Sequence, residues 1–229
     1  MRTFYQKYRH GLPALIYGVI YLIWFGILEQ RQTRDYMHVH MNIDDYIPFC
    51  EVFVVPYLLW FGYVAVVFGY LFFKDRDGYW KYAIFLAVGM TIFLVLSTWI
   101  PNGHNLRLKH FPRENVFTWM ISLLWKADTA TNLFPSIHVY NSLAAHYAVL
   151  HNKALSEKRW VRCGSFILCV SIILSTVLIK QHSMFDVLTA FILAAVMYVP
   201  VYYFDAVTVW RYNHRYQPGR GARKRARIS

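Results

Sequence analysis

Charged residues are scarce in this chain of 229 residues. Aspartate, glutamate, lysine and arginine make up 16% of it, whereas 57% is hydrophobic and 19% is aromatic. Soluble domains usually carry about 25% charged residues. The composition therefore indicates an integral membrane protein, and the length suits a single helical-bundle domain.

Cysteine is scarce as well. The chain has only Cys50, Cys163 and Cys169, and no two of them form a CxxC pair. An odd number argues against a disulfide framework. Cys163 and Cys169 lie in an apolar stretch, where we expect them to pack against neighbouring side chains.

Three common catalytic motifs are missing. Without a GxxxxGK loop, no phosphate-cradling nucleotide loop is expected, and without GxSxG there is no serine nucleophile elbow. No HExxH motif or dense carboxylate cluster supports metal-dependent hydrolysis. A metal site stays open as an alternative, with ligands drawn from His104, His110, His138, His182 and Asp186.

Long apolar runs are abundant. A helix that crosses a bilayer needs about 20 mainly apolar residues, and six segments are candidates, of which the fourth is the shortest and most polar. They are Leu12–Leu28, Val52–Phe73, Tyr82–Ile100, Pro135–Leu150, Cys163–Ile179 and Met184–Val209. We expect an all-α bundle of six transmembrane helices over residues 1–210, with an uncleaved first span because no small-x-small cleavage site follows it.

The positive charges indicate the orientation. If the N-terminus is cytoplasmic, most of the 24 lysines and arginines fall in cytoplasmic segments, as the positive-inside rule requires. Both termini are then cytoplasmic, and residues 211–229 form a basic, disordered tail on the anionic inner leaflet. The net charge of +12 is explained by this topology, so no nucleic-acid partner is expected.

The loop between the third and fourth spans, Pro101–Phe134, is too long for a simple turn. Within it, Val116–Trp125 is apolar and aromatic but too short to cross a membrane. We expect a helix that lies at the outer interface, either beside the site as a wall for lipid entry or in plain interfacial packing.

Three short polar segments interrupt the apolar pattern, and the topology places all three at the outer face. They are Asn105–Arg107, Pro135–His138 and Ser175–Asp186. Ionisable side chains are costly at membrane depth and persist mainly where they face a bundle interior or a wet cavity. The three segments together therefore predict one polar site.

His182 and Asp186 share a helix face, because residues four apart are neighbours on a helix. A carboxylate bonded to one imidazole nitrogen fixes the tautomer and leaves the other nitrogen free to attack. The alternatives are a structural His–Asp pair between helices or two ligands of a metal.

Pro135 and Ser136 are typical of a helix N-terminus, which places His138 in the first turn. Free backbone N–H groups make such an end an anion site, and a histidine there can act as general acid. The alternative is an ordinary helix cap with an interfacial histidine.

Arg107 suits bidentate phosphate binding. Lys180 lies two residues before His182, and Thr176 lies one turn earlier with a hydroxyl that can reach a phosphate oxygen. We therefore take Arg107, Lys180, Thr176 and Ser136 as candidate phosphate-binding residues.

With these motifs the chain resembles the type 2 phosphatidic acid phosphatase superfamily of membrane lipid phosphatases and phosphotransferases. That family carries Lys-x6-Arg-Pro, Pro-Ser-Gly-His and Ser-Arg-x5-His-x3-Asp. The second element is present here as Pro135-Ser136-Ile137-His138, and the third as Ser175-Thr176-x5-His182-x3-Asp186. The first is partial, as Asn105-Leu106-Arg107-Leu108.

The resemblance implies that His182 attacks phosphorus and forms a phosphohistidine, that Asp186 orients it, and that His138 protonates the departing alcohol. It implies that Ser136 and Arg107 hold phosphate oxygens, without a metal or organic cofactor. The substrate would be a lipid phosphate at the extracytoplasmic face of a membrane, with the plasma membrane as the expected location.

The departures from the family pattern open an alternative activity. Ile100 replaces the lysine of the first element, Leu108 its proline, and Thr176 the arginine of the third. Fewer cations suit a phosphodiester, as in the branch with sphingomyelin synthases and inositol-phosphoceramide synthases. The expected activity is therefore a lipid phosphatase, with a head-group phosphotransferase as the alternative and a non-catalytic lipid carrier or scramblase as a third reading. The sequence identifies neither the lipid nor the oligomeric state.

Overall fold

The computed structural model describes residue 6, residues 8–31 and residues 36–216. The chain is mostly helical, with one two-stranded parallel sheet in which β1 pairs with β2. The elements are η1 (Arg9–Gly11), α2 (Leu12–Glu29), β1 (Met37–His38), η2 (Asn42–Asp45), η3 (Glu51–Phe53), α3 (Val54–Lys74), α4 (Arg76–Trp99), β2 (Asn102–Gly103), α5 (Val116–Ala127), α6 (Ile137–His151), α7 (Lys153–Ser156), α8 (Arg159–Leu178), α9 (Met184–Tyr198), η4 (Val199–Tyr203, a π-helical turn) and α10 (Ala206–Tyr216).

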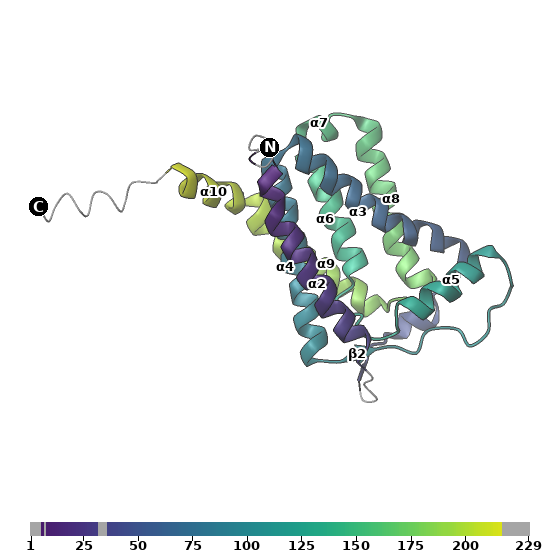
Figure 1. The fold of residues 1–229 in the computed structure, drawn as a ribbon. Coiled ribbons are helices and arrows are strands. Elements are labelled where there is room, and N and C mark those ends of the chain that lie inside the picture. The colour runs from purple at the N-terminus through teal and green to yellow at the C-terminus, as the bar shows by residue number, and fades with distance from the viewer. Residues whose placement is uncertain (1–5, 7, 32–35, 217–229) are drawn as a thin grey trace, which may run out of the picture.

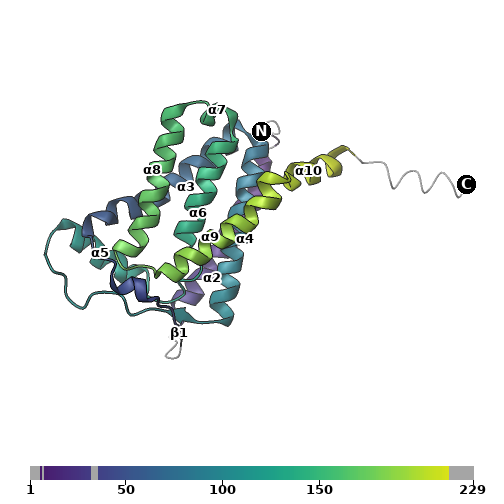
Figure 2. The same ribbon diagram turned by 180° about the vertical axis from the view of Figure 1, so that it is seen from behind.

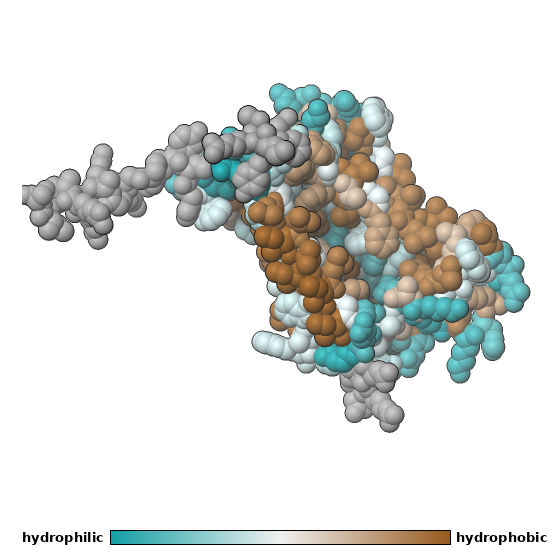
Figure 3. Space-filling view, viewed as in Figure 1, coloured by the Kyte–Doolittle hydropathy of each residue, from teal (hydrophilic) through white to brown (hydrophobic). Residues whose placement is uncertain are grey.

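Among the residues that the structure describes, five helical segments are long and apolar enough to cross a membrane. They confirm five of the six expected spans and are Arg9–Glu29, Glu51–Lys74, Arg76–Trp99, Arg159–Leu178 and Met184–Tyr203. On the face drawn in Figure 3, hydrophobic residues form broad areas along the bundle, and hydrophilic ones gather toward its ends. This surface is typical of a protein whose sides face lipid.

The expected fourth span is different, because α6 has 15 residues. At 1.5 Å per residue it measures about 22 Å, less than the roughly 30 Å of a hydrocarbon core. It contacts α3, α4, α8 and α9, and most of its side chains are buried by these helices. Its polar residues therefore face protein, which explains a composition too polar for a lipid-facing helix.

The two ends of the bundle differ. The start of α2, α7 and α10 lie at one end, and β1, β2, α5 and the start of α9 lie at the other (Figures 1 and 2). Since α6 ends at α7, its N-terminal residue Ile137 belongs to the second end. All three polar segments identified in the sequence therefore lie at the same end of the bundle.

The apolar segment of the long loop is helical, as expected, and forms α5. Asn115 caps it, because its side-chain oxygen accepts hydrogen bonds from the backbone N–H groups of Phe117 (2.9 Å) and Thr118 (3.0 Å). Ile121 is fully buried in a cluster with Tyr57 of α3. This contact fixes α5 against the bundle, across the end that carries the polar segments.

The chain beyond α9 departs from the expectation in two ways. A π-helical turn ends the last span near Tyr203, and Asp205 adopts a left-handed conformation with φ of 50° before α10 begins. The disorder expected from residue 211 is wrong for its first residues, because α10 continues to Tyr216 and Arg211 forms an ion pair with Asp77. The rest of the expected tail, 217–229, lies outside the described residues.

Candidate active site

The loop between α8 and α9 presents His182. Helix α8 ends in a turn in which Lys180 takes a left-handed conformation with φ of 55°. The carbonyl oxygen of Thr176 accepts hydrogen bonds from the backbone N–H groups of Gln181 (3.0 Å) and His182 (2.9 Å). These bonds terminate the helix and set the direction in which the chain presents His182.

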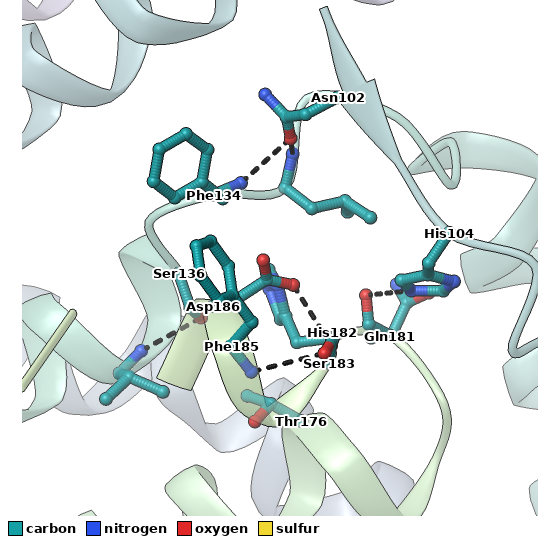
Figure 4. Close-up of polar contacts among 12 residues, drawn as sticks. Asn102, His104, Phe134, Ser136, Thr176, Gln181, His182, Ser183, Phe185 and Asp186 are labelled. Carbon is teal, nitrogen blue, oxygen red and sulfur yellow. Dashed lines mark hydrogen bonds and ion pairs between the residues drawn. The ribbon is translucent and has the colours of Figure 1, made fainter. Parts of the chain in front are cut away.

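Asp186 holds the His182 ring. Its Oδ2 atom lies 3.3 Å from Nδ1 of His182 and 3.0 Å from the backbone nitrogen of Ser183, and its Oδ1 has no partner among the described residues (Figure 4). Asp186 is fully buried in the first turn of α9. Because the carboxylate is an acceptor only, Nδ1 carries the hydrogen and Nε2 keeps a free lone pair.

His138 lies across from His182. Ser136 caps α6 by accepting a hydrogen bond from Val139, and its own N–H donates to the carbonyl oxygen of Asp186 at 3.2 Å. This bond ties the second polar segment to the third. As a result, the ring centroids of His138 and His182 are 5.7 Å apart.

Aromatic rings fix the orientation of His138. Its ring stacks on Tyr57 at 4.5 Å between centroids and lies 4.4 Å from the ring of Trp60. The ring is buried, and within the described chain its Nδ1 has no hydrogen-bond partner. Buried polar atoms without a partner are uncommon in folded proteins.

Asn102 secures the segment that leads into α6. Its side-chain oxygen accepts hydrogen bonds from the backbone N–H groups of Leu133 (2.7 Å) and Phe134 (3.1 Å), as Figure 4 shows. Its carbonyl oxygen accepts another from Asn132 at 2.7 Å. Since Asn102 belongs to β2, the small sheet holds the start of α6 in place.

Asp44 in η2 is a positioning residue that the sequence did not reveal. Its carboxylate accepts hydrogen bonds from the hydroxyl of Ser183 (2.5 Å) and the backbone N–H of Met184 (2.8 Å), and its side chain is buried. Lys180 Nζ donates to the carbonyl oxygens of Asp44 (2.9 Å) and Ile47 (2.6 Å). The polar loop after α2 is therefore locked onto both sides of His182.

The four candidate phosphate-binding residues are placed differently. Ser136 lies at the His138 end of the site. The Thr176 hydroxyl instead donates to the carbonyl oxygen of Ile173 in its own helix. The Lys180 ammonium is bound to the carbonyl oxygens of Asp44 and Ile47. The Arg107 guanidinium donates to Gln181 Oε1 and Asp128 O, both at 2.6 Å. Its Nε is buried with no partner in the described part of the chain.

A buried polar network links Arg107 to the histidines. Gln181 donates from Nε2 to the carboxylate of Asp128 (3.0 Å) and to the hydroxyl of Tyr57 (3.4 Å), and Tyr57 donates to the same carboxylate at 3.1 Å. Burial raises the pKa of the Asp128 carboxyl. Tyr57 also stacks on His138, so one network touches both histidine segments, and no sequence motif marked Tyr57, Gln181 or Asp128.

His104 joins the β2 segment to the same loop. Its Nε2 lies 2.9 Å from the carbonyl oxygen of Gln181, and its Nδ1 accepts a hydrogen bond from the backbone N–H of Leu106 at 3.2 Å. Nε2 therefore carries the hydrogen. Burial lowers the pKa of this imidazole to about 4, so the ring is neutral at physiological pH.

This lowered pKa predicts a loss of stability in mild acid. The unfolded chain binds a proton at residue 104 below about pH 6.5, whereas the folded protein does so only near pH 4. The stabilisation is complete above pH 6.5 and is lost as the pH falls toward 4, by about 3 kcal/mol in total. We expect the thermal midpoint of the wild type in detergent to fall more between pH 7.5 and 5 than that of His104→Gln.

The exposed His110 on the same loop provides the matched control. His110→Gln should show the same pH dependence as the wild type. If the thermal midpoints of His104→Gln and the wild type fell equally between pH 7.5 and 5, the assignment of a neutral, buried His104 ring would be contradicted.

In the described ranges, no group of three or more His, Cys, Asp or Glu side chains is arranged to hold a metal ion. The site that the described residues build is thus a pair of facing imidazoles, a buried carboxylate and a helix N-terminus. No protein-family model, curated protein sequence or solved structure matches this chain.

Proposed function

We propose that the chain is an integral-membrane phosphoryl-transfer enzyme that hydrolyses a lipid phosphomonoester through a phosphohistidine on His182. The observation that carries the proposal is the arrangement of His182, held by Asp186, 5.7 Å from the ring of His138. Attack needs about 3–3.5 Å between reacting atoms, and proton transfer needs a hydrogen bond of about 2.6–3.2 Å. Two imidazoles at this separation can flank a single phosphoryl group.

In the first step, Nε2 of His182 forms a bond to phosphorus and the bond from phosphorus to the lipid oxygen breaks. With the phosphate anion bound beside it, His138 holds a proton as imidazolium and gives that proton to the lipid oxygen. The phosphorylated ring of His182 is cationic, and the Asp186 carboxylate at its Nδ1 stabilises this charge. The lipid alcohol then leaves.

In the second step, the neutral His138 accepts a proton from water as the water attacks phosphorus. The N–P bond breaks, inorganic phosphate leaves, and His138 is again imidazolium. The phosphate oxygens lie at the N-terminus of α6, where backbone N–H groups and the helix dipole favour an anion. Ser136 and Arg107, whose Nε has no partner among the described residues, are the candidate side-chain donors.

The membrane arrangement follows from the same proposal. The short α6 serves as a sixth, protein-enclosed membrane helix, and both termini face the cytoplasm. The histidines then lie at the extracytoplasmic side, where α5 offers an apolar wall beside the site. The plasma membrane is the location that this topology favours.

The test is a substrate screen with the purified full chain in detergent. We expect release of inorganic phosphate from a lipid monophosphate such as phosphatidic acid, with His182→Ala as the blank. If no lipid monophosphate released phosphate above that blank, the phosphatase proposal would be rejected.

One observation favours a phosphotransferase as a second candidate. The ammonium of Lys180 is bound to backbone carbonyls, and most of the Arg107 guanidinium is bound within the protein. Few cations are then left for a phosphate dianion, which suits a phosphodiester. This candidate predicts transfer of a labelled head group to a second lipid alcohol, at a rate that depends on the acceptor.

A further inference from the structure

The end of the bundle opposite the histidines contains two adjoining hollows that share Arg9. The first, of about 1040 Å³, lies between α2 and α3 and reaches Tyr79 of α4. The second, of about 510 Å³, lies between η1, α4 and α10. Neither is lined by a residue of the histidine site, so both need an explanation of their own.

The first hollow is shaped for an extended apolar group. Ligand pockets commonly measure about 300–1000 Å³, and this one is lined mainly by apolar side chains and by glycines. At Gly18 and Gly69, an added Cβ would meet nothing within 4 Å. The exposed side chains of Leu15 and Leu22 stand on the same stretch of α2, the helix over which Figure 3 shows a hydrophobic band.

The second hollow is cationic and aromatic. Arg9, Arg76 and Arg211 line it together with Trp80 and Trp210. Tryptophan is enriched where a membrane meets water, and the guanidinium group binds phosphate in a bidentate manner.

The charge of Arg9, at the junction of the hollows, is not balanced by any of the described residues. Arg211 is paired with Asp77. Arg9 is exposed, and among the described residues its side chain makes no ion pair or hydrogen bond. A guanidinium therefore stands at the mouth of an apolar hollow with nothing in the described chain to neutralise it.

We propose that the two hollows form one binding site for an anionic phospholipid in the leaflet opposite the histidine site. The lipid phosphate binds Arg9 beside the tryptophans, and an acyl chain lies between α2 and α3 along Gly18 and Gly69. Basic pockets between membrane helices bind anionic head groups in this way. This lipid is a bound component of the fold and not the substrate, so the inference does not rest on the proposed activity.

The test is native mass spectrometry of the full chain in detergent, titrated with dioleoyl phosphatidylglycerol or dioleoyl phosphatidylcholine. We expect one phosphatidylglycerol to bind roughly tenfold more tightly than phosphatidylcholine, and Arg9→Gln to remove most of that preference, as expected for a charge-assisted contact. Arg159→Gln, at an exposed arginine near the same end of the bundle, is the charge control and should keep it.

The apolar hollow has matched controls of its own. Gly18→Leu and Gly69→Leu add a side chain to this hollow from positions where a Cβ meets nothing within 4 Å, and they should weaken binding of both lipids. Gly26→Leu and Gly62→Leu add the same side chain to the same two helices, also into open space but outside the hollow, and should bind like the wild type. Orthovanadate, a phosphoryl analogue for the histidine site, should leave binding unchanged.

Three results would overturn the inference. The first is an Arg9→Gln protein that keeps the full preference for phosphatidylglycerol. The second is an Arg159→Gln protein that loses as much of this preference as Arg9→Gln does, which would show a general attraction between the basic end of the bundle and anionic lipid. The third is displacement of the lipid by orthovanadate, which would place it at the histidines.

Discussion

His182→Ala is expected to lower phosphate release by roughly 10⁴-fold or more, because it removes the atom that forms the bond to phosphorus. Losses of this size follow removal of a nucleophile that acts as a unit with its partners. The His182 side chain is buried against Asp186, but its hydrogen bonds hold no helix together. The variant should therefore fold, which a thermal midpoint close to that of the wild type would confirm.

His110→Ala is the matched control, since His110 is exposed on the loop at the same end of the bundle. Its activity should equal that of the wild type in a steady-state assay of kcat and KM. Activity of His182→Ala within tenfold of the wild type would show that another group attacks phosphorus.

Asp186→Asn should have the second-largest effect, a loss of roughly 10³- to 10⁴-fold in kcat. The cap of α9 survives, because the hydroxyl oxygen of Ser183 still accepts a hydrogen bond from the backbone N–H of Phe185. When the asparagine amide nitrogen takes the place of Oδ2, it can donate to Nδ1 of His182 and thereby move the ring hydrogen to Nε2, which blocks the attacking lone pair. The substitution also removes the negative charge that stabilises the phosphorylated ring of His182.

The control for Asp186→Asn is Asp45→Asn, at an exposed carboxylate of η2 that pairs with His40. This change should leave kcat unchanged. The orienting role of Asp186 would be refuted by an Asp186→Asn protein with near-normal kcat, or by one whose loss lies wholly in KM.

The apolar runs predicted most of the bundle because length and hydropathy are properties of a local segment. The spacing of His182 and Asp186 likewise predicted their contact, since residues four apart meet on one helical turn. The approach of His138 to His182 could be inferred only from topology, which placed both at one end of the bundle. The structure brings the rings together, while their chemical roles stay a prediction.

The missed positioning contacts join segments far apart in the chain. Asp44 accepts a hydrogen bond from Ser183, although most of the sequence that forms the bundle lies between these two residues. Gln181 likewise contacts both Tyr57 and Asp128. A single sequence carries no local signal for such pairs.

Two sequence expectations concerned basic residues. Lys180 was expected to bind phosphate because of its position near His182, yet its left-handed backbone directs the ammonium to the carbonyls of the Asp44 loop. The run of basic residues suggested a disordered tail, yet the ion pair of Arg211 with Asp77 holds α10 to α4. In both cases a tertiary contact outweighed the charge pattern.

The most direct measurement is to trap the covalent adduct in a His138→Gln protein supplied with 4-nitrophenyl phosphate. The nitrophenolate departs without a proton from residue 138, whereas the later attack of water loses its base, so the adduct should accumulate. Peptide mass spectrometry at alkaline pH, where phosphohistidine survives, should then find one phosphoryl group on His182. Nitrophenolate release with no phosphoryl group on His182, or with one on a different residue, would contradict the central claim.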